Sequence, residues 1–69
     1  MSDIRGTVVD FEERRGDGWL TSDQGESLYF HCVEIADGTR SILVGARVRA
    51  RRGPGRRGVD EAYAIVPED

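Results

Sequence analysis

Three side chains that can stack on a flat ligand lie at alternate positions of two short apolar runs. Trp19 belongs to residues 18–22 (GWLTS), and Tyr29 and His31 belong to residues 27–33 (SLYFHCV). Successive side chains of an extended strand point to opposite faces. The alternation therefore places the three rings on the face opposite Leu20, Leu28 and Phe30.

If the aliphatic side chains fill the interior, Trp19, Tyr29 and His31 form an exposed aromatic cluster. Such a cluster is unfavourable for solubility unless it serves a ligand with flat faces, and nucleic-acid bases are such ligands. Two alternatives stay open from the residues alone: the strands face the other way, or the rings only cover an edge of the core.

Other reactive residue types are too sparse for catalysis or metal binding. His31 and Cys32 are the single histidine and cysteine, and as strand neighbours they point to opposite faces, so we expect no metal site. The acids Asp10, Glu12, Glu13 and Asp17 have no nucleophile or metal set beside them. We expect no catalytic residue, no cofactor and no enzymatic activity. The acids form a solvated turn, or they discourage promiscuous nucleic-acid binding or attract a basic partner.

Charge is distributed unevenly along the 69 residues, whose net charge is -3. The first 37 residues hold nine acids and three arginines, whereas seven arginines and no acid occupy residues 40–57. A basic face can therefore coexist with an acidic total, and arginine suits phosphate contacts. The candidates for phosphate contacts are Arg47, Arg49 and Arg51 on one strand face, and Arg52, Arg56 and Arg57 on a loop. The simpler interpretation is that these arginines only form a solvated charged face.

The elements that would position these residues are five short strands. They are predicted over residues 4–11, 18–22, 27–33, 46–51 and 62–66, with a bulge or bend at Gly6. Residues 52–58 (RGPGRRG) are predicted to form a loop, and only residues 33–36 favour a helical turn. Frequent glycine turns between short strands indicate one all-β domain over residues 1–69, a five-stranded antiparallel OB-fold barrel with its core in about 4–66.

The order of these segments resembles the cold-shock domain family from about Gly6 to Val66. The first strand of that family, G-x-V-K-W-F-N, corresponds to GTVVDFE at residues 6–12. Its two nucleic-acid-binding signatures, K-G-F-G-F-I and V-F-V-H-F, correspond to RGDGWL at residues 15–20 and LYFHC at residues 28–32. Both signatures at this spacing, in a chain of this length, make the resemblance fairly specific.

The resemblance implies a site on the outer face of the barrel, and this chain departs from it. Of seven stacking positions, three keep rings, at Trp19, Tyr29 and His31. The other four have become Asp10, Asp17, Cys32 and Thr39. Because stacking contributes roughly 1–3 kcal/mol per base, we expect weakened binding. The resemblance adds Arg15 at the signature lysine, Arg14 beside it, and Phe11 from the first strand.

The function implied by the resemblance is binding of single-stranded RNA or DNA with low sequence specificity, as an RNA chaperone or regulator. The alternative is a cold-shock-derived protein-interaction module in which substitutions on the nucleic-acid-binding face have weakened or removed that binding. A single cysteine, and no run of about 20 apolar residues, lead us to expect a cytoplasmic protein without membrane or metal partners.

Overall fold

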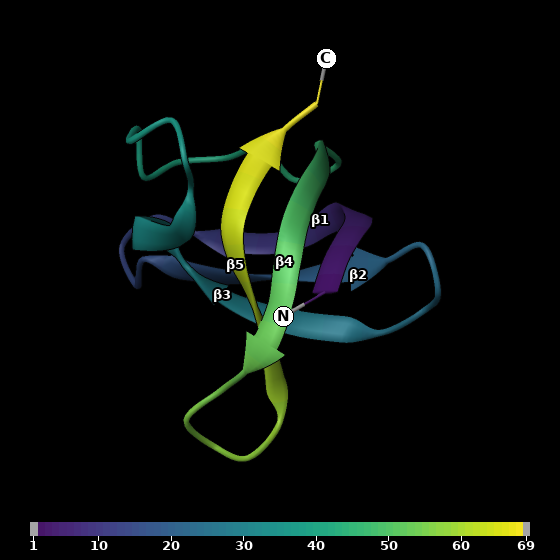
Figure 1. Cartoon of the computed structure of the whole chain (residues 1–69). Helices are drawn as coiled ribbons and strands as arrows, with labels where there is room; N and C mark the ends of the chain where they lie inside the picture. The colour runs from purple at the N-terminus through teal and green to yellow at the C-terminus, as the bar shows by residue number, and fades with distance from the viewer. Residues whose placement is uncertain (1, 69) are drawn as a thin grey trace.

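The computed structural model describes residues 2–68, in which five strands close into a barrel (Figure 1). The strands are β1 (Ser2–Glu12), β2 (Asp17–Ser22), β3 (Ser27–His31), β4 (Arg47–Pro54) and β5 (Asp60–Pro67), and the 3-10 turn η1 (Cys32–Glu34) follows β3. Around the barrel the order is β1-β2-β3-β5-β4, and β4 pairs with β1 to complete the ring. The predicted five-stranded OB-type barrel is confirmed.

One strand pair departs from the expected antiparallel arrangement. β3 and β5 run parallel, paired through Tyr29 and Glu61, while the other four neighbouring pairs are antiparallel. The reason is geometric: strand direction cannot alternate at every step around a ring with an odd number of strands. A closed barrel of five strands must contain at least one parallel pair.

The length of β1 allows it to serve two neighbours. Its first half pairs with β4 and its second half with β2, and an extra residue at Val9 shifts the register against β2. The bulge that the sequence predicted at Gly6 therefore lies at Val9. Gly6 instead marks a close approach, because an added Cβ would collide with the backbone carbonyl of Thr21.

The predicted C-terminal ends of the third and fourth strands were wrong. The third strand stops at His31, and the predicted helical turn begins earlier, as η1. The fourth strand continues through Arg52 and Gly53 to Pro54, so the segment predicted as loop begins as strand. Proline is accepted because it occupies the last position of the strand, opposite Asp60.

The interior is filled by the alternate side chains that the pattern predicts. Leu20 and Phe30 are fully buried, and Leu28 is almost fully buried. Ile35, which follows η1, is buried and bridges to Ile65. The core residues are Val8, Leu20, Leu28, Phe30, Ile35, Val48, Ala50, Ala62 and Ile65. Within residues 2–68, no helix is long and apolar enough to cross a bilayer.

Candidate functional site

Trp19, Tyr29 and His31 form a continuous row of rings on the outside of β2 and β3, which we call the aromatic face. Trp19 and Tyr29 are paired directly across the two strands. The ring centroids of Trp19 and Tyr29 are 5.4 Å apart, those of Tyr29 and His31 are 5.0 Å apart, and both pairs meet edge to face. Trp19 is 40% exposed and His31 is exposed, so the predicted orientation of the strands is confirmed.

Glycine allows the backbone beside the aromatic face to pack closely. An added Cβ at Gly18 would collide with the carbonyl oxygen of Asp10 and press on the Phe30 ring. Gly16 adopts a φ of 74°, in the left-handed region that side chains disfavour, as it turns the chain into β2. The tight turn brings Arg15 and Asp17 to the edge of the rings.

Asp17 links Tyr29 and Arg15 at the edge of the aromatic face. Asp17 is 8% exposed, and its carboxylate accepts hydrogen bonds from the Tyr29 hydroxyl and from Nε of Arg15. Burial tends to raise the pKa of Asp17, but the hydrogen bonds from Tyr29 and Arg15 and the charge of Arg15 outweigh it, so the pKa lies below its ordinary value. The pKa of Tyr29 is raised, first by its hydrogen bond to Asp17 and then by burial.

Asp10 and Arg15 form an exposed ion pair at the same edge. Asp10 lies opposite Trp19 in the pairing of β1 with β2, and Nη2 of Arg15 is 3.4 Å from its Oδ2. Arg15 therefore bridges the two carboxylates that replace aromatic rings in the resemblance. The hydrogen bond to Asp17 is the main reason why the pKa of Arg15 is raised, so this cation stays charged.

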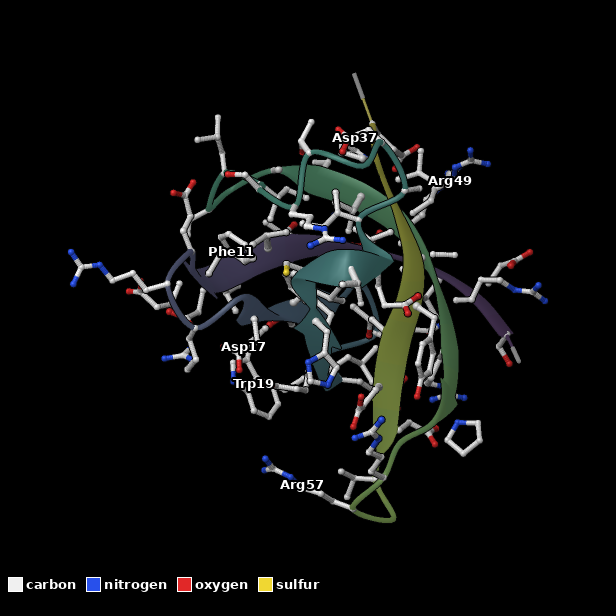
Figure 2. The ribbon with its side chains drawn as sticks, turned by 90° about the vertical axis from the view of Figure 1, so that its left-hand side faces the viewer. Phe11, Asp17, Trp19, Asp37, Arg49 and Arg57 are labelled. Carbon is white, nitrogen blue, oxygen red and sulfur yellow. The ribbon has the colours of Figure 1, made fainter. Side chains whose placement is uncertain are left out.

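The loop between β4 and β5 brings a second cation to the aromatic face. The guanidinium carbon of Arg57 lies over the Tyr29 ring, 5.8 Å from its centroid, within cation–π range. Beneath this loop, an open hollow of about 560 Å³ extends from Trp19 and Tyr29 to Val59, with Glu26 and Asp60 among its lining residues. Figure 2 shows Asp17, Trp19 and Arg57 on one side of the barrel.

The four other predicted site residues lie outside the row of rings, one of them at the margin of the core and one already paired. The Phe11 ring packs parallel to Phe30, with centroids 6.0 Å apart, and so belongs to the margin of the core. Arg52 lies in β4, where Nη1 is 2.6 Å from Oε1 of Glu26 and Nε is 3.5 Å from Oδ2 of Asp60. Arg14 is exposed in the turn before β2, and Arg56 is exposed in the same loop as Arg57.

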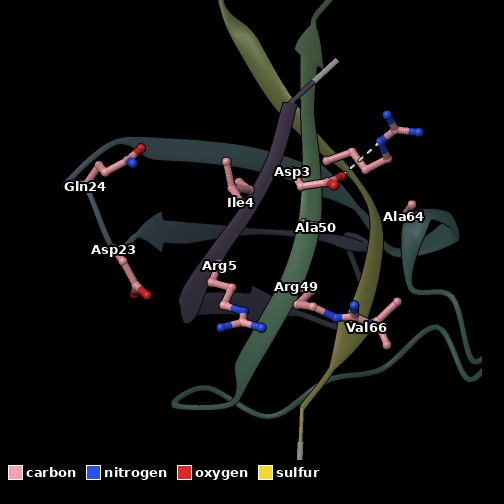
Figure 3. A pocket seen from close by; sticks show the side chains of 10 residues that line it. Asp3, Ile4, Arg5, Asp23, Gln24, Arg49, Ala50, Ala64 and Val66 are labelled. Carbon is pink, nitrogen blue, oxygen red and sulfur yellow. Dashed lines mark ion pairs between the residues drawn. The ribbon is translucent and has the colours of Figure 1, made fainter.

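The alternating arginines of β4 lie on a different face. Arg47, Arg49 and Arg51 are exposed, as predicted, and Arg49 and Arg51 line a hollow of about 600 Å³ formed with β1 and β5 (Figure 3). Arg47 forms two hydrogen bonds of 2.7 and 2.8 Å to Asp23, and Arg51 is 3.4 Å from Asp3. These arginines are separate from the aromatic face.

The fold and site define an OB-type barrel that carries exposed rings and two nearby guanidinium groups on one side. No protein-family model matches this sequence, and a search of curated proteins finds no match.

Proposed function

We propose that this protein binds single-stranded nucleic acid on the aromatic face, in the manner of a cold-shock domain. The observation that carries the proposal is the unbroken row of Trp19, Tyr29 and His31 across two paired strands. Unstacked bases gain free energy on such rings whatever their sequence. Arg57 and Arg15, at the margins of the row, would contact the phosphates of the bound strand.

The binding is expected to be weak. Stacking on three rings at about 2 kcal/mol per base gives about 6 kcal/mol, which corresponds to a dissociation constant of roughly tens of micromolar. Asp10 and Asp17 place negative charge beside the path of the phosphates, although Arg15 offsets part of it. Strands so held would exchange quickly, which suits a protein that keeps transient RNA structures open.

The fluorescence of Trp19, the single tryptophan, provides the test. We expect dT7 and its RNA equivalent to quench it saturably at low salt, and less strongly near physiological salt. Tyr29→Ala should remove most of the binding because the central ring is lost. Tyr29→Phe is the matched control: it keeps the ring, loses the hydroxyl that bonds Asp17, and should retain binding.

A second candidate function rests on the hollow beside Trp19. Its exposed apolar side chains, Trp19 and Val59, suit an apolar segment of a protein partner, whereas its carboxylates at Glu26 and Asp60 already pair with Arg52. The titration separates the two functions. If no strand quenches Trp19 at low salt and high micromolar concentration, nucleic-acid binding is rejected and the protein-interaction function is favoured.

A further inference from the structure

We propose that Asp10 and Arg15 select guanine as the base that stacks on Trp19. The inference rests on the proposed function, and it concerns Asp10, which replaces a ring of the cold-shock pattern, and Arg15, which occupies the signature lysine position. It assigns a base preference to a surface whose rings alone would accept any base.

The geometry places an acceptor and a donor beside the indole ring. Asp10 of β1 is the cross-strand partner of Trp19 in β2, and facing side chains of paired strands lie within contact distance. The Asp10 side chain is 56% exposed, and Nη2 of Arg15 is 3.4 Å from its Oδ2. Arg15 cannot swing freely, because its Nε is bonded to the buried Asp17. A base lying on Trp19 would present its edge to this pair.

The chemistry of the pair matches one base better than the others. A carboxylate only accepts hydrogen bonds and a guanidinium only donates them, so Asp10 and Arg15 together offer two acceptors and a donor. The Watson–Crick edge of guanine carries two donors, N1–H and the N2 amine, beside the acceptor O6. Adenine and cytosine each present one donor group there, and thymine and uracil have their single donor between two acceptors.

A single strand leaves that edge accessible. Recognition of unpaired bases commonly combines stacking on an aromatic ring with hydrogen bonds to the Watson–Crick edge. The same carboxylate also repels phosphate, so Asp10 lowers the affinity for every strand while it favours guanine. These opposite effects provide a signature that a purely structural role for Asp10 would not produce.

The test compares four heptamers: dT7, and dT7 with guanine, inosine or adenine at the central position. Titration midpoints, followed through Trp19, give the affinities. A bidentate contact to a base edge typically discriminates roughly 5- to 150-fold, so at this exposed site we expect guanine to bind about five- to tenfold more tightly than thymine. Inosine lacks the N2 amine and should lose most of that advantage. A strand with central adenine controls for the stronger stacking of purines.

Two substitutions of the same residue type test the role of Asp10. Asp10→Asn should abolish the guanine preference and tighten binding of dT7, since a repulsive charge is removed. Asp3→Asn removes the same charge from the same strand, next to Arg51 on the other face, and should leave the preference intact. Thermal unfolding of both variants verifies that each is folded.

The outcomes are distinguishable. If wild-type protein binds the guanine and thymine strands equally, the inference is overturned while stacking on the aromatic face stands. A guanine preference that persists in Asp10→Asn, or that adenine shares, assigns the selectivity to stacking and also overturns it. If no heptamer binds, the proposed function fails and this inference fails with it.

Discussion

At the scale of single residues, Asp17 has a different role from the one its position suggests. The sequence predicts a carboxylate that repels phosphate from an outward position. In the structure the carboxylate is covered, and hydrogen bonds from Tyr29 and Arg15 compensate for its burial. Asp17 therefore fixes the central ring and one cation of the candidate site in place.

This role predicts a dependence of stability on pH. The pKa of Asp17 is lower in the folded chain than in the unfolded chain, so the unfolded chain takes up its proton first as pH falls. The stabilisation is complete above about pH 5 and is lost as pH falls below about 4 and through the folded pKa. Asp17→Ala should lower the free energy of unfolding at pH 7 by about 1–3 kcal/mol and flatten its decline in acid, as measured by urea denaturation.

Asp37→Ala is the control for this effect. Asp37 also has a lowered pKa, caused by hydrogen bonds from its own neighbour Thr39, but it lies exposed in the loop after η1. We expect a much smaller loss at pH 7. Equal losses in the two variants would contradict a special role for Asp17.

The orientation of the rings was predictable from sequence, whereas their connections were not. Trp19, Tyr29 and His31 face outward because alternation along a strand depends only on local geometry. The bond between Asp17 and Tyr29 joins residues diagonal to each other across β2 and β3, so it depends on pairing register. The ion pair of Arg52 with Glu26 likewise could not be predicted from sequence, because it forms only where the fold brings β4 beside the β2–β3 turn.

At the scale of elements, β5 contains a bulge with a strained residue. Two residues of β5 lie between Tyr63 and Val66, whereas only one residue of β4 lies between their partners Arg51 and Arg49. Within this bulge Ala64 adopts a φ of 52°. The Ala64 N–H donates to Oε1 of Glu34, 3.1 Å away, so η1 helps to hold the bulge. An alanine in the left-handed region costs roughly 1–2 kcal/mol.

Glycine at this position should therefore stabilise the barrel. The relief of strain exceeds the roughly 0.5–1 kcal/mol that glycine loses through its greater freedom when unfolded, so Ala64→Gly should raise the free energy of unfolding by about 0.5–1 kcal/mol. Thermal or urea unfolding measures the change. Ala36→Gly, at an exposed position without a positive φ, should be destabilising, and a loss of stability in both variants would argue against strain at Ala64.

The existence of the strands was easier to predict than their ends. Five apolar runs separated by glycines predicted five strands, and all five are present. The ends depend on tertiary pairing: β4 extends to Pro54 because β5 is there to pair with Gly53 and Pro54. The parallel pairing of β3 with β5 follows from closure of the ring, and neither strand's own sequence predicts it.

At the scale of the whole molecule, the polarised charge of the sequence is partly neutralised by ion pairs between its two halves. Arg47 and Arg51 of the basic half meet Asp23 and Asp3 of the acidic half. The cations left beside the aromatic face are few, chiefly Arg57 together with the partly neutralised Arg15. Any bound strand would therefore gain little from phosphate contacts.

This distribution predicts a shallow salt dependence of binding. Each phosphate contact to a single strand contributes about -0.7 to the slope of log affinity against log salt, so one or two contacts give a slope of about -1. Arg57→Gln should make the slope shallower by about 0.7. Arg49→Gln, on the face away from Trp19, should leave it unchanged; a slope steeper than about -3 would show that the β4 arginines take part.

The narrow contact between β3 and β5 has a consequence for aggregation. Every strand of the ring has two neighbours, so none is an edge strand along its whole length to which a second copy could readily add. The seam most easily opened is the one held by the single strand pair of Tyr29 with Glu61 and by the bridge from Ile35 to Ile65. Opening it would expose the unpaired backbone N–H and C=O groups of β3 and β5, to which another chain could pair. Because Tyr29 belongs both to this seam and to the aromatic face, a ligand on that ring would also protect the chain from self-association.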